Sequence, residues 1–210
     1  MRITGPSRFD EVVAAWLKAE AKSPQFAHCI PLQDSDRHII ERPNLDDPAA
    51  NSRRFRLLFS YREGILRYIS GIAEWYQAEL SGDDLAGLFA GPYPSWEIYS
   101  GCTGRVVRVA EAIRHGVLPR VLDENIHRGL ATIQKHVTGT YDSMMRGEAV
   151  DPLILLENGK EGGLTVIEGT KRATALCWCH ILDGVPCAGV AAFIGITQRA
   201  NPWVSPHATP

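Results

Sequence analysis

Residues 164–182 read LTVIEGTKRATALCWCHIL, which places a strand, a tight turn and the start of a helix in direct succession. Leu164–Ile167 are apolar or β-branched, a composition that favours a buried strand. Gly169 permits a sharp turn at a point where a Cβ atom would clash. From Thr170 onward apolar residues recur at helical spacing, and Asp183-Gly184 supplies a stop signal. We therefore expect a strand, a glycine turn and a helix here, and we relate the other segments to this unit.

The predicted turn lies at a helix N-terminus, which suggests an anion site. Unpaired backbone N–H groups and the positive end of the helix dipole favour negative charge there. Lys171 and Arg172 would add two cationic side chains, and Glu168 ends the preceding strand. We expect Gly169, Thr170, Lys171 and Arg172 to bind phosphate, with Glu168 as a candidate catalytic carboxylate. The alternative is a purely structural corner with two exposed basic residues.

The run Glu168-Gly169-Thr170-Lys171-Arg172, followed by Ala173 and Ala175, resembles the strand, G-x-x-R turn and helix of the ParB and sulfiredoxin superfamily. Residues 141–157, YDSMMRGEAVDPLILLE, are similar to the lead-in of that family, in which a glycine ends a helix and a proline opens a strand. The resemblance covers the last third of the chain. It departs from the family at Thr170 and Lys171, where Glu, His or Cys is common.

This resemblance implies a function. In the superfamily a nucleotide phosphate lies against the turn, so ATP or another nucleotide is the implied ligand and Mg²⁺ the implied metal. The implied reaction is transfer or hydrolysis of a phosphoryl group, as in the ParB-like free-serine kinases, with a small molecule as acceptor. Glu168 would position Mg²⁺ or accept a hydroxyl proton. The sulfiredoxin reaction is not favoured, because Thr170 stands where its turn cysteine would be.

A second glycine-rich segment, Ser100-Gly101-Cys102-Thr103-Gly104-Arg105, follows a predicted strand over 96–100 and precedes a predicted helix over 106–115. Glycines and hydroxyls before a helix can hold an anion, although the spacing and lysine of a Walker A loop are absent. The candidates are Gly101, Thr103, Gly104 and Arg105 for ligand binding and Glu97 as a second catalytic carboxylate. The hypothesis is that both turns face one ligand. The alternative is a plain connection between strand and helix.

The net charge of the chain indicates which classes of binding partner to expect. The chain has a formal net charge of -2 and a pI of about 6.4, without the basic bias of a dedicated nucleic-acid binder. A ParB-type nucleic-acid-associated module or a nuclease stays the alternative function, because five arginines lie between Arg53 and Arg67. The favoured partners are a nucleotide and a small-molecule acceptor, and a homo-oligomer stays open.

Location follows from hydrophobic runs and cysteines. No apolar run approaches the length of a membrane span, and Met1–Thr4 opens no signal-peptide pattern. The five cysteines are odd in number and irregularly spaced, so we expect reduced thiols and no metal site. Cys177 and Cys179 on one helix would point about 200° apart and so would not share a zinc ion. These observations favour a cytoplasmic protein without membrane contact.

We expect one mixed α/β (α+β) domain over 1–210, a small twisted sheet with covering helices. Residues 1–94 would form a mainly helical N-terminal elaboration, 95–200 the ParB/sulfiredoxin-like core, and 201–210 an irregular tail. The other predicted elements are helices over 7–21, 52–69, 81–89 and 125–146, the last kinked or divided, strands over 74–80, 152–156 and 188–196, and a solvated loop over 22–50.

Overall fold

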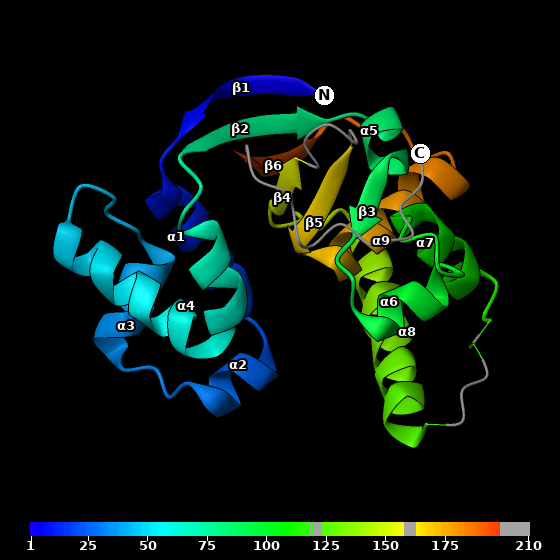
Figure 1. Ribbon diagram of the computed structural model, residues 1–210, viewed down its shortest axis with the longest axis horizontal. Coiled ribbons are helices and arrows are strands. Elements are labelled where there is room, and N and C mark those ends of the chain that lie inside the picture. Colours follow the sequence, from blue (N-terminus) through cyan, green and yellow to red (C-terminus); the bar gives the residue numbers. More distant parts are fainter. Residues whose placement is uncertain (118, 120–122, 158–162, 198–210) are drawn as a thin grey trace.

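The computed structural model of the chain describes residues 1–117, 119, 123–157 and 163–197. Within these ranges the fold is mixed α/β, with helices on both sides of an open six-stranded mixed sheet (Figure 1). The helices are α1 (Phe9–Glu20), α2 (Pro24–Cys29), α3 (Asp34–Glu41), α4 (Pro48–Ile69), α5 (Gly82–Ala86), α6 (Pro94–Tyr99), α7 (Val106–Arg114), α8 (Glu124–Met145) and α9 (Thr170–Cys177), which continues as a π-helical turn over Trp178–Leu182. The strands are β1 (Arg2–Ser7), β2 (Glu74–Leu80), β3 (Leu88–Ala90), β4 (Leu153–Glu157), β5 (Leu164–Glu168) and β6 (Val190–Ile196).

The strands follow the order β1-β2-β6-β4-β5-β3 across the sheet. The pairs β1/β2, β2/β6 and β4/β5 are antiparallel, whereas β6/β4 and β5/β3 are parallel. The sheet thus draws on both halves of the chain, because β1, β2 and β3 all precede residue 95. The predicted strands over 74–80, 152–156, 164–167 and 188–196 are confirmed, with small shifts at their ends.

Alternation along β4 shows how the sheet separates two cores. Leu153 and Leu155 point to one face and Ile154 and Leu156 to the other, and all four are buried. The first face packs against α7, α8 and α9. The second packs against α1–α4, which we call the helical lobe. Figure 1 shows the helical lobe on one side of the molecule and α6–α9 on the other, with the sheet joining them.

The predicted loop over 22–50 is wrong, because this segment contains α2 and α3. Phe26 and Ile40 are buried in the core of the helical lobe, and neither belongs to a periodic run long enough to predict a helix. Asp36 accepts from the Gln33 N–H group and from the Arg53 guanidinium, with Nε to Oδ1 at 2.7 Å. Contacts with α4, distant in the sequence, therefore stabilise these short helices.

The predicted strand over 96–100 is also wrong, because this segment forms α6. Pro94 occupies the first turn, where its missing N–H group costs nothing. Trp96 and Tyr99 share one buried face at helical spacing, and Tyr99 Oη donates to the Leu130 carbonyl at 3.0 Å. Two buried aromatic residues three positions apart outweigh the alternation that suggested a strand. The following glycine-rich segment therefore joins two helices.

Several smaller differences concern element ends. The helix predicted over 81–89 ends at Ala86, since Leu88 and Phe89 belong to β3. The helix α8 is continuous, so the predicted kink or division near residue 139 is wrong. The helix predicted from residue 52 begins at Pro48, because Asp47 is its N-cap. The predicted helices over 7–21 and 106–115 are confirmed with small shifts at their ends, since α1 begins at Phe9 and Ser7 belongs to β1.

Among the described residues, none of the helices is both long enough and apolar enough to cross a membrane. The predicted tail over 201–210 lies outside the described residues. Asn158-Gly159 also lies outside them; this dipeptide is typical of a hairpin turn, and β4 and β5 on either side of it pair antiparallel.

Candidate functional site

The turn between β5 and α9 has the left-handed geometry that its sequence predicts. Gly169 has φ +91° and ψ 22° and forms the N-cap of α9. A Cβ atom at this position would lie 2.7 Å from Arg172 Nη2 and 2.9 Å from Leu153 Cδ2. Only glycine therefore fits both the backbone and the space. By helix geometry, the N–H groups of the first turn of α9 lack partners within the helix.

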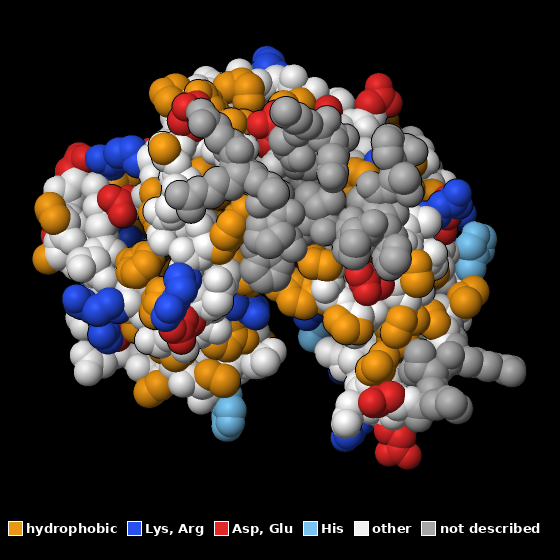
Figure 2. Space-filling view, viewed as in Figure 1, with side chains coloured by type: hydrophobic (Ala, Val, Ile, Leu, Met, Phe, Trp, Pro, Cys, Tyr) orange, Lys and Arg blue, Asp and Glu red, His pale blue; other side chains and the backbone are white. Residues whose placement is uncertain are grey.

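This turn lies at one wall of a cavity of about 990 Å³ between the helical lobe and α8. Figure 2 shows the opening as a hollow between the two parts. The wall from the helical lobe includes Glu20, Lys22, Tyr61 and Arg62; the opposite wall includes Tyr93, Lys135, His136, Gly139, Thr140, Ser143, Glu148 and Asp151; and Glu168, Gly169, Thr170, Lys171 and Arg172 lie between them. A cavity of this size can hold a nucleotide-sized ligand.

Glu168 is the carboxylate nearest the turn. Its side chain is 19% exposed, and its Oε1 lies 3.6 Å from Arg172 Nη2. Burial raises the pKa of Glu168, and the Arg172 charge opposes this shift only in part, while Glu20 adds to it. Glu168 is therefore a base that takes up a proton more readily than an exposed glutamate.

Lys171 reaches across to α8, where its Nζ lies 3.0 Å from His136 Nδ1. Burial, followed by the charges of Lys171 and Lys135, lowers the pKa of His136. Burial likewise lowers the pKa of Lys171. The shift of His136 favours a neutral imidazole whose Nδ1 can accept from Lys171 Nζ, a contact that holds the Lys171 side chain at the cavity wall.

The Arg172 guanidinium is hydrogen-bonded to the backbone through one of its nitrogens. Its Nη2 donates to the Pro152 carbonyl at 3.3 Å, and its Nε is buried without a protein partner among the described residues. A buried donor without an acceptor costs free energy, so a ligand oxygen that reached it would stabilise the site. Arg172 thus supports the turn and lines the cavity.

The second predicted turn is not brought to this cavity. Gly101 and Gly104 have left-handed φ values, but none of the residues 97 and 100–105 lines the cavity wall. The N–H groups of residues 101–105 all donate to acceptors in the segment or in the end of α6, for example Gly104 N to Ser100 Oγ at 3.0 Å. Thr103 Oγ1 donates to the Ser100 carbonyl at 2.8 Å. Because these backbone N–H groups already have acceptors in the protein, few of them remain to bind an anion.

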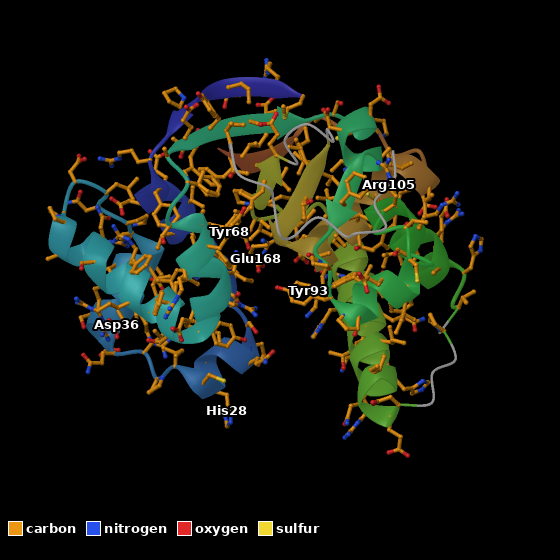
Figure 3. The ribbon with its side chains drawn as sticks, viewed as in Figure 1. His28, Asp36, Tyr68, Tyr93, Arg105 and Glu168 are labelled. Atoms are coloured by element: carbon orange, nitrogen blue, oxygen red, sulfur yellow. The ribbon has the colours of Figure 1, made fainter. Side chains whose placement is uncertain are left out.

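Arg105 and Glu97 also lie away from the cavity at the Gly169 turn. The Arg105 guanidinium stacks 4.1 Å from the centre of the Phe89 ring and donates to the Gly87 carbonyl at 3.2 Å. The carbonyl of Glu97 accepts from Cys102 N at 2.7 Å, which ties α6 to the segment that follows. Figure 3 shows Arg105 well away from Glu168 and Tyr93, which lie at the inner end of the hollow. The structure thus separates the two sets of candidate residues.

Most of the arginines of α4 already have partners. Arg54 is fully buried and donates to the carbonyls of Ile39 and Asn44, while Arg53 pairs with Asp36. Arg67 pairs with Glu63 on the same helix. These contacts engage three of the five arginines on which the nucleic-acid alternative depended.

The cavity residues that were not predicted include Glu20, Arg62 and His136. These three come from α1, α4 and α8 and meet the Gly169 turn only in the folded chain. Arg62 has a local signal, because Gly64 weakens the helix beside it and the backbone at Arg62 leaves helical geometry at φ -128° and ψ 35°. Nothing in the sequence near Glu20 or His136 indicates a site.

The residues at the turn fit a phosphorylated ligand better than a bare metal ion. Lys171 and Arg172 bring positive charge to the cavity wall beside the Gly169 turn. Among the described residues no group of three His, Cys, Asp or Glu side chains is placed to hold a metal ion. Mg²⁺ bound with a nucleotide needs only one or two carboxylates from the protein, and Glu168 can supply one.

Comparisons with models of known protein families, with curated proteins and with solved structures find no match for this chain.

Proposed function

We propose that this chain binds a nucleotide, ATP or a similar one, at the Gly169 turn and transfers its terminal phosphoryl group to a small-molecule hydroxyl or to water. One observation carries the proposal. The left-handed turn at Gly169 brings a partly buried carboxylate, Glu168, and two cations, Lys171 and Arg172, to the wall of a nucleotide-sized cavity. The resemblance of residues 168–175 to the ParB and sulfiredoxin superfamily supports the same function.

Phosphoryl transfer depends on positioning and charge neutralisation more than on a strong nucleophile. The N–H groups at the start of α9 and the side chains of Lys171 and Arg172 would hold phosphate oxygens. The raised pKa of Glu168 suits it to accept the proton of an attacking hydroxyl group near neutral pH. Mg²⁺, where it accompanies the nucleotide, would neutralise phosphate charge, and Glu168 is the carboxylate placed to hold it.

Arg172→Ala is expected to weaken nucleotide binding about tenfold or more, because loss of a charge-assisted contact costs roughly 1.5–3 kcal/mol. It should also lower the unfolding midpoint slightly, since the contact with the Pro152 carbonyl is lost. Isothermal titration calorimetry with ATP and ADP, with and without Mg²⁺, measures the first effect. Unchanged affinity would remove the turn from the site.

Two further arginines provide comparisons in the same titration. Arg108 is exposed on α7 and pairs with Glu111, so Arg108→Ala controls for loss of positive charge far from the cavity. Arg105→Ala examines the second turn. Weaker binding in Arg105→Ala than in Arg108→Ala would bring residues 101–105 back into the site.

The broader test is a thermal-shift screen of ATP, ADP and CTP with Mg²⁺, followed by turnover assays with hydroxyl-bearing acceptors. A ligand of the folded state raises the unfolding midpoint by mass action. No shift with any nucleotide would contradict the proposal. A shift without turnover for any acceptor or water would favour a nucleotide-binding module without catalysis.

A further inference from the structure

Arg62 lies on the wall of the cavity opposite the Gly169 turn and belongs to the helical lobe. The helix α4 is kinked at this residue, where φ is -128° and ψ is 35°. The regular helix before the kink packs in the lobe core, whereas Arg62 turns into the cavity. A departure from helical geometry costs free energy, and such costs concentrate at functional positions.

Two contacts hold the Arg62 side chain in place. Its Nε donates to Glu20 Oε1 at 2.5 Å, and the same oxygen accepts from Trp16 Nε1 at 3.2 Å. The guanidinium carbon lies 4.5 Å from the centre of the Tyr61 ring. The Glu20 side chain is only 6% exposed, so this ion pair is shielded from water on the carboxylate side. The guanidinium is therefore anchored by the hydrogen bond from Nε and by the Tyr61 ring.

The terminal nitrogens of Arg62 stay available to a ligand. Among the described residues its only hydrogen bond runs from Nε, and 36% of the side chain is exposed. Arg172, by contrast, uses Nη2 on the Pro152 carbonyl and is 17% exposed. Two unoccupied terminal groups of a fixed guanidinium match the spacing of two oxygens on one phosphate.

We propose that Arg62 is the anion-binding residue of the helical lobe, and that it contacts the phosphate groups of a ligand from the side opposite Lys171 and Arg172. Glu20 and Tyr61 are its positioning residues, because they contact the guanidinium at Nε and at the face of its plane. This inference rests on the proposed function, since it assumes a phosphorylated ligand at Gly169. The competing explanation is that Arg62 serves only as counter-ion for the buried Glu20.

The two explanations predict different results for Arg62→Lys. A counter-ion needs only a positive charge near Glu20, whereas a bidentate phosphate contact needs the planar guanidinium fork. We expect Arg62→Gln to weaken binding of Mg-ATP and of tripolyphosphate about tenfold or more, and Arg62→Lys to recover only part of this loss. Arg56→Gln, an exposed position on the same helix that does not line the cavity, should bind as the wild type does.

Removal of Arg62 leaves Glu20 buried without its partner, so Arg62→Gln can also lower stability. The double variant Glu20→Gln/Arg62→Gln removes both charges and keeps both shapes, and it should fold while showing the same loss of binding. Titration calorimetry measures affinity, and circular dichroism melts establish that each variant is folded.

The outcomes separate this inference from the proposed function. Wild-type affinity in the folded double variant, or full recovery in Arg62→Lys, would overturn the role of Arg62 and leave the Gly169 site standing. No binding of Mg-ATP or tripolyphosphate by the wild type would instead contradict the proposed function itself. Weaker binding by the double variant, together with wild-type affinity in Arg56→Gln, would support both the role of Arg62 and the proposed function.

Discussion

Glu168→Gln is expected to lower phosphoryl-group turnover by about 10² to 10⁴ while nucleotide affinity changes little, because amide and carboxylate have the same shape but only the carboxylate accepts a proton or holds Mg²⁺. The position of Glu168 at the end of β5, just before the Gly169 turn, puts this carboxylate beside the proposed phosphate site. Turnover and affinity are measured separately, by steady-state kinetics and by calorimetry.

The same substitution gives an independent result for stability. Since burial raises the pKa of Glu168 above the ordinary 4.5, the folded protein binds more protons than the unfolded chain between these two values. Stability therefore falls as pH rises through this window, and the charged side chain destabilises the fold above it. We expect Glu168→Gln to melt at a higher temperature than the wild type at pH 7.5, and this difference to disappear near pH 4.

A structural carboxylate would behave in the opposite way. If Glu168 served mainly to pair with Arg172 or cap α9, the glutamine variant would lose roughly 1 kcal/mol and keep its turnover. Glu157→Gln is the matched control, because Glu157 ends the neighbouring strand β4 and does not line the cavity. Equal turnover in both variants would exclude catalysis by Glu168.

Gly169→Val is expected to destabilise the fold by about 2 to 6 kcal/mol and to abolish ligand binding. A β-branched residue at φ +91° adds backbone strain of about 1–3 kcal/mol. The new side chain would also overlap Arg172 Nη2 and Leu153 Cδ2, and overpacking of this kind adds about 1–3 kcal/mol. Urea denaturation measures the sum, which is a large share of the stability of an ordinary domain.

Gly147→Val separates the two contributions. Gly147 also has a left-handed backbone, at φ +81°, but a Cβ atom there would meet nothing within 4 Å. This variant should show the strain alone, and the excess loss in Gly169→Val measures the overlap at the turn. Equal losses in the two variants would mean that Arg172 and Leu153 move aside freely, and the close fit proposed for this site would be wrong.

The sequence of residues 164–172 is sufficient to predict their local structure. A β-branched run followed by Glu-Gly predicts a strand and a left-handed turn, because few other residues tolerate that backbone, and both features are present. The strand 74–80 and the helix 106–115 are similar cases, since each carries its own period of apolar residues. The general class, helices around a mixed sheet, follows from such segments together.

Long-range contacts decided the features that prediction missed. The helices α2 and α3 form because Phe26 and Ile40 find a core and Asp36 finds Arg53, partners that no local pattern announces. The segment 96–100 became a helix for the same reason, since burial of two aromatic residues overrode alternation. The resemblance to ParB and sulfiredoxin, and the nucleotide with it, stays a prediction.

The candidate site shows the same division. Glu168, Lys171 and Arg172 are neighbours in the chain, so their grouping is a property of the sequence. Glu20, Arg62 and His136 reach the same cavity only because the sheet carries the helical lobe and α8 on either side of the turn. Glu97 and residues 100–105 carry comparable side chains, but the packing of α6 and α7 turns them elsewhere. Which charges meet is settled by tertiary packing, because side-chain proximity across a fold depends on distant contacts that no short segment encodes.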